Sequence, residues 1–286
     1  MANVAVLTDS TADLSPEQAA GAGITVVPLY VRFGADEFRA GVDLTTEQFW
    51  GKLLAAGAPI PSTAAPSPGD FTKAFTAAFD AGADAIVCPT IGSKLSATFQ
   101  SATLAAESMT GREIHVIDTG STSMSTGIPA ILAAEMAREG TAAADIAAEI
   151  RRRLPDVDLF VGVDTLEYLR KGGRLSAARA VVGSMLSVKP LITVRDGLVV
   201  MADKQRSRAK IRALVISNIA SAPVERLAVL HTPTSTPEEI AEFRATLLAA
   251  IPGGVDPSRV TTGVIGASTG PHLGPDLMGA SFLRKR

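Results

Sequence analysis

The sequence predicts an α/β protein of two domains: an N-terminal α/β/α domain around a parallel sheet (residues 1–155) and a C-terminal α/β domain around a mixed sheet (residues 156–286). Three observations support this prediction. Before Pro155, short apolar runs alternate with longer amphipathic stretches, which is typical of parallel strands joined by helices. Farther along, Asp196-Gly197 separates two runs rich in β-branched residues, which predicts an antiparallel hairpin. A chain of 286 residues with 47% hydrophobic side chains is also long and apolar enough for about two domain cores.

Four apolar runs of the N-terminal half have the length of buried strands: Val4–Leu7, Thr25–Val31, Ala85–Cys88 and Ile114–Ile117. The stretches between and after these runs have helical patterns. Two helices begin at a Ser-Pro pair, in which serine caps the helix and proline occupies its first position. One expected helix begins at Ser15. The others cover Thr45–Ala56, Ser67–Asp80, Ala97–Met109, Thr126–Glu139 and Ala142–Leu154.

The elements of the C-terminal half are shorter and more varied. The expected strands are Leu159–Val163, Leu191–Val194, Leu198–Ala202, Leu227–His231, Val260–Ile265 and Ala280–Leu283. The expected helices are Leu166–Arg170, Ala177–Leu186, Arg208–Ala220 and Pro237–Ile251. A hairpin among helices predicts a mixed sheet, and therefore a domain of a different design.

Composition excludes several classes of function. The 27 basic and 29 acidic side chains give a net charge of −2, which argues against a broad nucleic-acid-binding face. The one cysteine, Cys88, excludes an internal disulfide and fits a reducing compartment, while His115, His231 and His272 form no metal-binding motif. We find no signal peptide and no apolar run long enough to span a membrane. We therefore expect a soluble cytoplasmic protein without a metal or an organic cofactor.

Four loops of the N-terminal half are rich in hydroxyl side chains and carry little charge: Thr8–Thr11, Pro61–Pro66, Thr90–Ser96 and Asp118–Gly127. Helix capping and turn formation explain each loop taken singly. Ligands of parallel α/β sheets bind outside the carboxyl ends of the strands, and we expect all four loops at that edge. Hydroxyls, backbone N–H groups and helix N-termini together favour an anion such as a carboxylate or a phosphate.

Alternatives remain open at this point. Ser96 or Ser123 with His272 as its base would make the chain a small-molecule hydrolase or transferase, although the sequence lacks a nucleophile elbow. The same loops would suit a regulator that binds a sugar or a phosphate. The glycine-rich motifs of dinucleotide and nucleotide sites are missing. The basic segment Leu166–Ser176 is either a helix end with a favourable dipole or a docking edge for an acidic or phosphorylated partner.

Six motifs, in order along nearly the whole chain, resemble those of the DegV family. They are Thr8–Leu14, Thr63–Pro66, Ser93–Ala102, Leu169–Ser176, Lys189-Pro190 and His272–Pro275. The resemblance implies two α/β domains with a ligand between them. It also implies a fatty-acid-binding protein, the acyl-carrying subunit of bacterial fatty acid kinase. In that role the chain itself is not an enzyme, because it presents a bound fatty acid to a separate ATP-dependent kinase subunit.

The resemblance extends to individual residues. Thr63 matches the family's carboxylate-binding threonine, Ser96 its second hydroxyl ligand, and Arg174 an arginine suspected of helping the kinase partner. With the hydroxyl-rich loops, the expected ligand-binding residues are Asp9, Ser10, Ser62, Thr63, Ser93, Ser96, Ser123 and His272. The expected docking residues are Arg170, Lys171 and Arg174. The family's Thr-Ser-Gln-Pro is Thr63-Ala64-Ala65-Pro66 here, which keeps the threonine and alters the hydrogen bonding beside it.

The resemblance implies a long-chain fatty acid as the ligand, such as one of about 16 to 18 carbons. Burial of about 14 methylenes, as in a chain of about 16 carbons, would yield roughly 11 kcal/mol before the costs of association. Its apolar wall is expected from Phe99, Leu104, Ile128, Ile131, Met185 and Leu186. We expect a monomer with no nucleic-acid partner, no membrane span and at most transient contact with a membrane.

Overall fold

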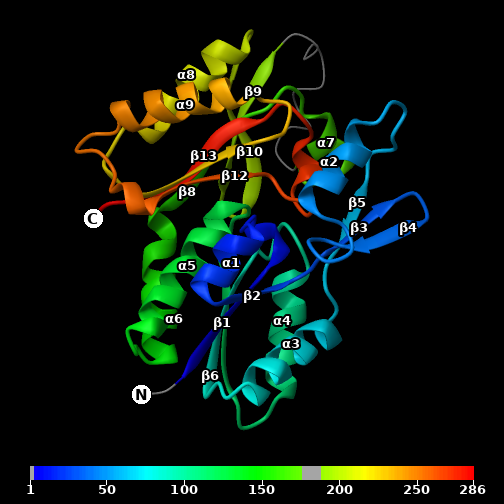
Figure 1. The fold of residues 1–286 in the computed structure, drawn as a ribbon, viewed down its shortest axis with the longest axis vertical. Coiled ribbons are helices and arrows are strands. Elements are labelled where there is room, and N and C mark those ends of the chain that lie inside the picture. Colours follow the sequence, from blue (N-terminus) through cyan, green and yellow to red (C-terminus); the bar gives the residue numbers. More distant parts are fainter. Residues whose placement is uncertain (1–2, 176–187) are drawn as a thin grey trace.

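The computed structural model describes residues 3–175 and 188–286, and in these residues it contains three β-sheets (Figure 1). The strands of the four-stranded sheet all precede Thr119, whereas those of the six-stranded sheet all follow Asp156. The expected helix over Ala177–Leu186, which includes Met185 and Leu186, lies outside the described residues.

All four strands of the N-terminal sheet run parallel, in the order β2-β1-β6-β7. They are β1 (Val4–Asp9), β2 (Ile24–Val27), β6 (Ala85–Thr90) and β7 (Glu113–Asp118). Neighbouring residues of a strand point to opposite faces, so Val6 and Val87 face one layer of helices while Leu7 and Ile86 face the other. The expected parallel sheet, covered on both faces, is confirmed.

Helices form a layer on each side of this sheet. One layer contains α1 (Pro16–Ala22), α5 (Met124–Arg138) and α6 (Ala143–Arg153), and it packs mainly alanine and isoleucine on the sheet. The other contains α3 (Pro68–Asp80) and α4 (Thr98–Ser108). In α3 the buried phenylalanines recur every four residues, so they share the helix face that meets the sheet.

The six-stranded sheet has the order β10-β9-β8-β13-β11-β12, and β11 and β12 are its one parallel pair. The strands are β8 (Val157–Gly162), β9 (Lys189–Arg195), β10 (Leu198–Gln205), β11 (Val224–His231), β12 (Val260–Val264) and β13 (Met278–Arg284). Asp196 and Gly197 both have positive φ between β9 and β10, as a tight hairpin turn requires. The mixed sheet and its hairpin are confirmed.

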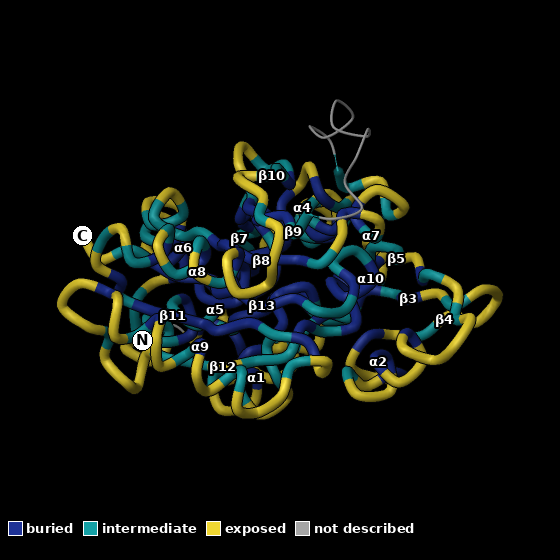
Figure 2. The backbone as a smooth tube through the Cα atoms, turned by 90° about the horizontal axis from the view of Figure 1, so that it is seen from above, coloured by how far each residue is buried: buried dark blue, intermediate teal, exposed yellow. Residues whose placement is uncertain are grey.

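Helices cover both faces of the six-stranded sheet. On one face lie α8 (Arg208–Ile219) and α9 (Pro237–Ala250). On the other lies α5, which also covers the parallel sheet and so joins the two halves of the molecule (Figure 1). The hydroxyl of Ser125 on α5 is 3.1 Å from that of Ser281 on β13, and Arg226 on β11 pairs with Glu135. The N-terminal part of α5 and nearly all of β13 are buried at the centre of the molecule (Figure 2).

A third, antiparallel sheet was not expected from the sequence. It has the order β4-β3-β5, with β3 (Tyr30–Phe33), β4 (Asp36–Arg39) and β5 (Ser62–Ala64). The single strand expected over Thr25–Val31 is wrong, because the chain leaves the parallel sheet after Val27 and enters this sheet at Tyr30. Pro28 lies at the break, where it has no N–H to donate to a neighbouring strand.

Three further α-helices lie near the small sheet (Figure 1). They are α2 (Thr46–Leu54), α7 (Glu167–Lys171) and α10 (Gly270–Leu273). Thr45 caps α2 in a capping box, and Phe49 and Trp50 on this helix are buried. Within residues 3–175 and 188–286, no helix is long and apolar enough to cross a membrane.

Candidate functional site

Loops from both halves of the chain enclose a pocket with about 490 Å³ of space outside the protein atoms, part of it open to solvent. Its apolar lining residues are Leu29, Ile91, Leu95, Leu169, Val199 and Leu273. Its lining residues with hydroxyls are Thr11, Thr63, Ser96, Thr122, Ser268 and Thr269. His272 and Arg174 complete the lining and bring an imidazole and a positive charge to it.

Thr63 and His272 meet at this pocket from distant parts of the chain. Thr63 lies on β5, where it pairs with Val31 of β3. His272 lies on α10, which starts with Gly270-Pro271, and its Nε2 is 2.9 Å from the Thr63 hydroxyl. The expected loop over Pro61–Pro66 is therefore a strand at Thr63, and the contact links the small sheet to the C-terminal half.

Burial controls the charge of His272. It lowers the pKa of the ring to about 4, with a smaller effect from the positive charge of Arg174. The imidazole is therefore neutral at about pH 7 and carries one proton. Its Nδ1 has no partner in the described part of the chain and packs against Gly172, where a Cβ would overlap it. A proton on Nδ1 would be an unsatisfied buried donor, which favours the proton on Nε2. Nε2 then donates to Thr63, whose own hydroxyl proton is available to a ligand.

Ser96 lies in the loop between β6 and α4. Its Oγ is 2.8 Å from the hydroxyl of Thr98 and accepts a hydrogen bond from the Thr98 N–H, so it serves the start of α4. The same loop is packed closely at Gly92, where a Cβ would be 2.8 Å from the carbonyl carbon of Gly120. Only a residue without a side chain allows this approach of two backbones.

The C-terminal half holds the same loop in place. Nε of Arg174 donates to the carbonyl of Leu95 at 3.2 Å, and its Nη1 donates to the carbonyl of Gly172 at 2.6 Å. Nζ of Lys94 donates to the carbonyl of Asp196 in the β9–β10 hairpin at 2.8 Å. Ser96 is thus positioned by contacts from both halves of the molecule.

Asp9 and Ser10 hold loops together beside the pocket and are not part of its lining. The buried carboxylate of Asp9 accepts hydrogen bonds from the N–H and hydroxyl of Thr11 and from the N–H of Ile91. Burial nevertheless raises the pKa of Asp9 above its usual value. The hydroxyl of Ser10 is 2.6 Å from that of Ser268, across the boundary between the two halves.

Three other expected ligand-binding residues also lie outside the pocket lining. Ser123 is buried and donates its hydroxyl proton to Asp13 at 2.6 Å. Ser62 and Ser93 are exposed. Of the eight residues expected from the sequence, the structure therefore brings three together in the pocket wall: Thr63, Ser96 and His272.

The apolar wall differs from the expected one. Ile128 and Ile131 on α5 pack in the core between the sheets, Leu104 is 48% exposed on α4, and Phe99 is half-buried. The lining comes instead from loops and from elements of the C-terminal half. Helical periodicity identifies a buried face, but it does not say whether another helix or a pocket lies against that face.

Four further hydroxyl residues line the pocket. Thr11 and Thr122 lie in loops that were expected at the site, although neither was named as a ligand-binding residue, whereas Ser268 and Thr269 were missed. Ser268 and Thr269 follow β12, which runs parallel to β11, so they lie beyond the carboxyl end of a parallel strand. This is the same signal that identified the N-terminal loops. It was overlooked because the sequence does not show that β12 has a parallel neighbour.

The site geometry does not favour a serine nucleophile. His272 is bonded to Thr63, while Ser96 is bonded to Thr98 and Ser123 to Asp13. A nucleophilic serine needs its base within hydrogen-bond reach. In the part of the chain that the structure describes, no cluster of three His, Cys, Asp or Glu side chains is arranged to hold a metal ion.

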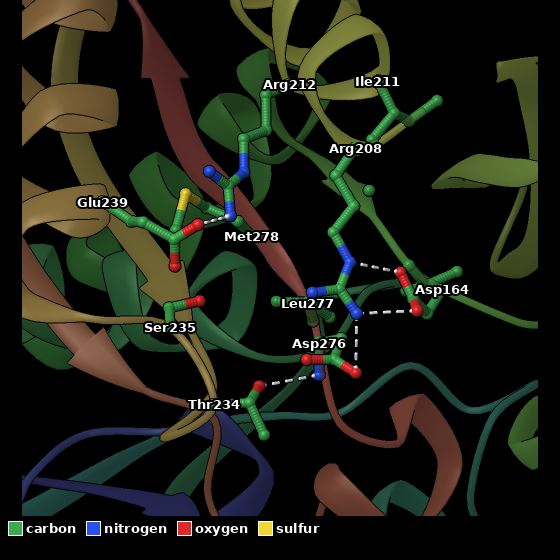
Figure 3. Close-up of a pocket in the computed structure, with 12 residues that line it drawn as sticks. Asp164, Arg208, Ile211, Arg212, Thr234, Ser235, Glu239, Asp276, Leu277 and Met278 are labelled. Atoms are coloured by element: carbon green, nitrogen blue, oxygen red, sulfur yellow. Dashed lines mark hydrogen bonds and ion pairs between the residues drawn. The ribbon is translucent and has the colours of Figure 1, made fainter. Parts of the chain in front are cut away.

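A second pocket, of about 350 Å³, lies at the start of α8 (Figure 3). Its charged side chains pair with one another. Arg208 is 2.8 Å from Asp164 and 2.9 Å from Asp276, and Arg212 is 3.1 Å from Glu239. These pairs satisfy the charges that a ligand would need, so we regard this pocket as structural.

The expected docking residues lie next to the first pocket. Arg170 and Lys171 are exposed on the last turn of α7, where Lys171 pairs with Glu167 at 2.8 Å. Arg174 is half-buried and reaches the pocket wall. The positive charges therefore extend from the surface of α7 to the edge of the pocket.

Comparison with known proteins agrees with this structure. A family model described as "Uncharacterised protein, DegV family" matches residues 3–285. A DegV domain-containing protein of Deinococcus radiodurans is 39% identical over 208 residues, which are 73% of each chain.

Solved structures have the same fold. One, described as fatty acid binding of a DegV family protein from Thermus thermophilus, is 30% identical and has a TM-score of 0.88 over 99% of this chain and 100% of the other. A second, described as DegV, a fatty acid binding protein from Bacillus subtilis, is 29% identical and has a TM-score of 0.87 over 100% of both chains. The match over almost the full length of the chain, together with the two sheets joined by α5, shows that this protein belongs to the DegV family.

Proposed function

We propose that this protein binds a long-chain fatty acid in the pocket between an N-terminal domain (residues 1–155) and a C-terminal domain (residues 156–286). In this proposal it presents the ligand to a separate ATP-dependent kinase subunit and does not itself catalyse a reaction. The observation that carries the proposal is the meeting of Thr63, Ser96 and His272 beside an apolar wall.

The head-group end suits a carboxylate. Thr63 has a hydroxyl proton to donate because Nε2 of His272 supplies the other hydrogen bond, and Ser96 lies in the same wall. Hydrogen bonds to an ionised acceptor are stronger than those between neutral groups. Arg174 adds a positive charge at the pocket edge, where two of its N–H groups are engaged by backbone carbonyls.

The tail end suits a hydrocarbon chain. Leucine, isoleucine and valine side chains line the same pocket as the hydroxyls, and two relatives of this fold are described as fatty-acid-binding proteins. A chain of about 16 to 18 carbons gains most of its affinity from burial, at about 0.8 kcal/mol per methylene. The hydroxyls then determine which end of the ligand lies at Thr63.

The kinase step requires access to the carboxylate. In the proposed reaction, a carboxylate oxygen attacks the terminal phosphorus of ATP in the partner's site, and the bond to ADP breaks. The exposed Arg170 and Lys171 follow Leu169 of the pocket lining, and in this proposal they dock an acidic surface of that partner. Arg174, three residues after Lys171, lines the pocket itself.

Mass spectrometry of lipid extracted from the denatured protein, followed by calorimetric titration of the delipidated protein with palmitate, tests the binding step. Thr63→Val and Ser96→Ala each remove one hydroxyl and should lower palmitate affinity about tenfold or more, the effect of losing a hydrogen bond to a charged group. Thr25→Val is the matched control, because Thr25 lies exposed on β2 and outside the pocket lining. Unchanged affinity in both pocket variants would refute the assignment.

The presentation step has its own test. Arg170→Glu with Lys171→Glu should keep palmitate affinity and reduce acyl phosphate formation when an ATP-dependent fatty acid kinase subunit is added. Formation of acyl phosphate from ATP by this chain alone would contradict the carrier role.

A further inference from the structure

Asp13 is buried at a junction of three segments that surround the pocket. It follows the short 3-10 helix Ser10–Ala12 and has a left-handed backbone conformation, with φ 51°. Its carboxylate accepts hydrogen bonds from the Ser123 hydroxyl at 2.6 Å, the Thr269 hydroxyl at 2.8 Å and the Gly266 N–H at 3.0 Å. Ser123 also has positive φ, so two strained residues are bonded to each other here.

Each segment held by Asp13 carries a residue of the pocket wall. Thr122 is the neighbour of Ser123, and Thr269 itself lines the pocket. The carbonyl of Thr269 accepts the N–H of His272 at 3.0 Å. A continuous path of hydrogen bonds therefore leads from Asp13 through Thr269 to His272, and from there to Thr63.

The same loop is supported on its other side by the aromatic residues of α2. The indole N–H of Trp50 donates to the carbonyl of Ile265 at 2.8 Å. Gly270 packs against Phe49 and Trp50, which leave no space for a side chain at that position. The aromatic contact places the start of α10 against α2, and the Asp13 contacts tie it to the N-terminal half.

We propose that Asp13 is a positioning residue of the carboxylate site, which fixes His272 against Thr63 through Thr269 although it does not itself line the pocket. This inference deepens the proposed function and rests on it. It assigns a role to the buried carboxylate of Asp13, whose hydrogen bonds reach the lining directly at Thr269 and indirectly through Ser123, the chain neighbour of Thr122.

The energetics of Asp13 support a functional role. Burial raises the pKa of its carboxyl to about 6, despite three hydrogen-bond donors, and the nearby negative Asp9 adds to this effect. An ionised Asp13 is therefore held in the fold at a cost in stability. Residues of this kind are found where function, rather than stability, requires them.

Asp13→Asn, Thr269→Val and Thr269→Ser test the proposal. Asn keeps the shape of the carboxylate and removes its charge, Val removes the Thr269 hydroxyl, and Ser retains it. The ring Cε1–Hε1 NMR signal of His272 in the ligand-free protein and the dissociation constant for palmitate are measured for each variant. Ile150→Val, in the core between α6 and the parallel sheet, is the control for loss of stability alone.

Asp13→Asn and Thr269→Val should shift the His272 signal and weaken palmitate binding about tenfold, whereas Thr269→Ser should keep the wild-type signal and affinity and Ile150→Val should change neither. A His272 signal unchanged in the Asn and Val variants would overturn the positioning role. If the unmodified protein does not bind palmitate, the proposed function fails, and the His272 signal still decides whether Asp13 positions the ring. If Asp13→Asn does not fold, the comparison of Thr269→Val with Thr269→Ser decides whether the hydrogen bond between Asp13 and Thr269 positions His272.

Discussion

Replacing Asp13 by asparagine should make the protein more stable near neutral pH, although it disturbs the carboxylate site. The pKa of the carboxyl is raised from 3.8 to about 6, chiefly because burial disfavours its charged form. The folded state therefore binds this proton more tightly than the unfolded chain, and the free energy of unfolding falls as pH rises from about 4 to about 6.

The magnitude follows from the same two pKa values. At about 1.4 kcal/mol for each pH unit between 3.8 and about 6, ionised Asp13 lowers the free energy of unfolding near pH 7 by about 3 kcal/mol. Asn does not titrate, so the variant should gain up to about this amount near pH 7. The gain should shrink to about 1 kcal/mol at about pH 4.5, where the folded wild-type carboxyl is already protonated.

Urea unfolding of the ligand-free protein at these two pH values, followed by fluorescence of the one tryptophan, measures both differences. The comparison between the two pH values cancels any pH-independent effect of the amide side chain. A variant that loses stability equally at both pH values would refute the reasoning, because the loss would then come from packing or from the hydrogen bonds and not from the buried charge.

Two further predictions concern backbone packing and the buried thiol. Gly92→Ala should cost about 1–3 kcal/mol of stability and weaken palmitate binding, since the new Cβ displaces the loop that carries Ser96. Gly21→Ala on α1 is the control, because Gly21 has open space around it, and this substitution should leave stability unchanged or raise it. Equal changes in stability for the two variants in urea unfolding would contradict the packing argument. Burial strongly raises the pKa of the Cys88 thiol, so iodoacetamide should label Cys88 only after the protein is unfolded in urea. The mass of the protein measures the labelling, and rapid labelling of the native protein would contradict the burial of the thiol.

Local patterns were sufficient for most of the secondary structure. Ser15, Thr45 and Ser67 each cap a helix close to the expected start, because a cap depends on residues within one turn of it. The Asp196-Gly197 turn was predictable for the same reason, since positive φ at both positions is a property of those two residues. The parallel sheet was predictable because apolar runs that alternate with helices have few other ways to be buried.

The choice of partners for each strand was not predictable from local patterns. Thr25–Val31 looks like one strand, yet its two ends belong to different sheets, and β5 pairs with β3 across more than thirty residues. A short strand of three residues has too little sequence pattern to be recognised before its neighbour is known. The position of Thr63 in a sheet, and not in a loop, follows from that pairing.

By itself, the sequence determined the α/β class, most of the helices and strands of the two larger sheets, and a set of candidate hydroxyl residues that includes Thr63 and Ser96, with His272 as a candidate beside them. Only the tertiary structure decided which of these hydroxyls share a pocket, that His272 faces Thr63, and that Asp13 ties together three segments around them. The physical reason is the distance along the chain over which each interaction acts, because capping, turn formation and hydrophobic periodicity depend on residues close together in the sequence. Contacts between residues more than two hundred positions apart depend on how the sheets and α5 pack as a whole.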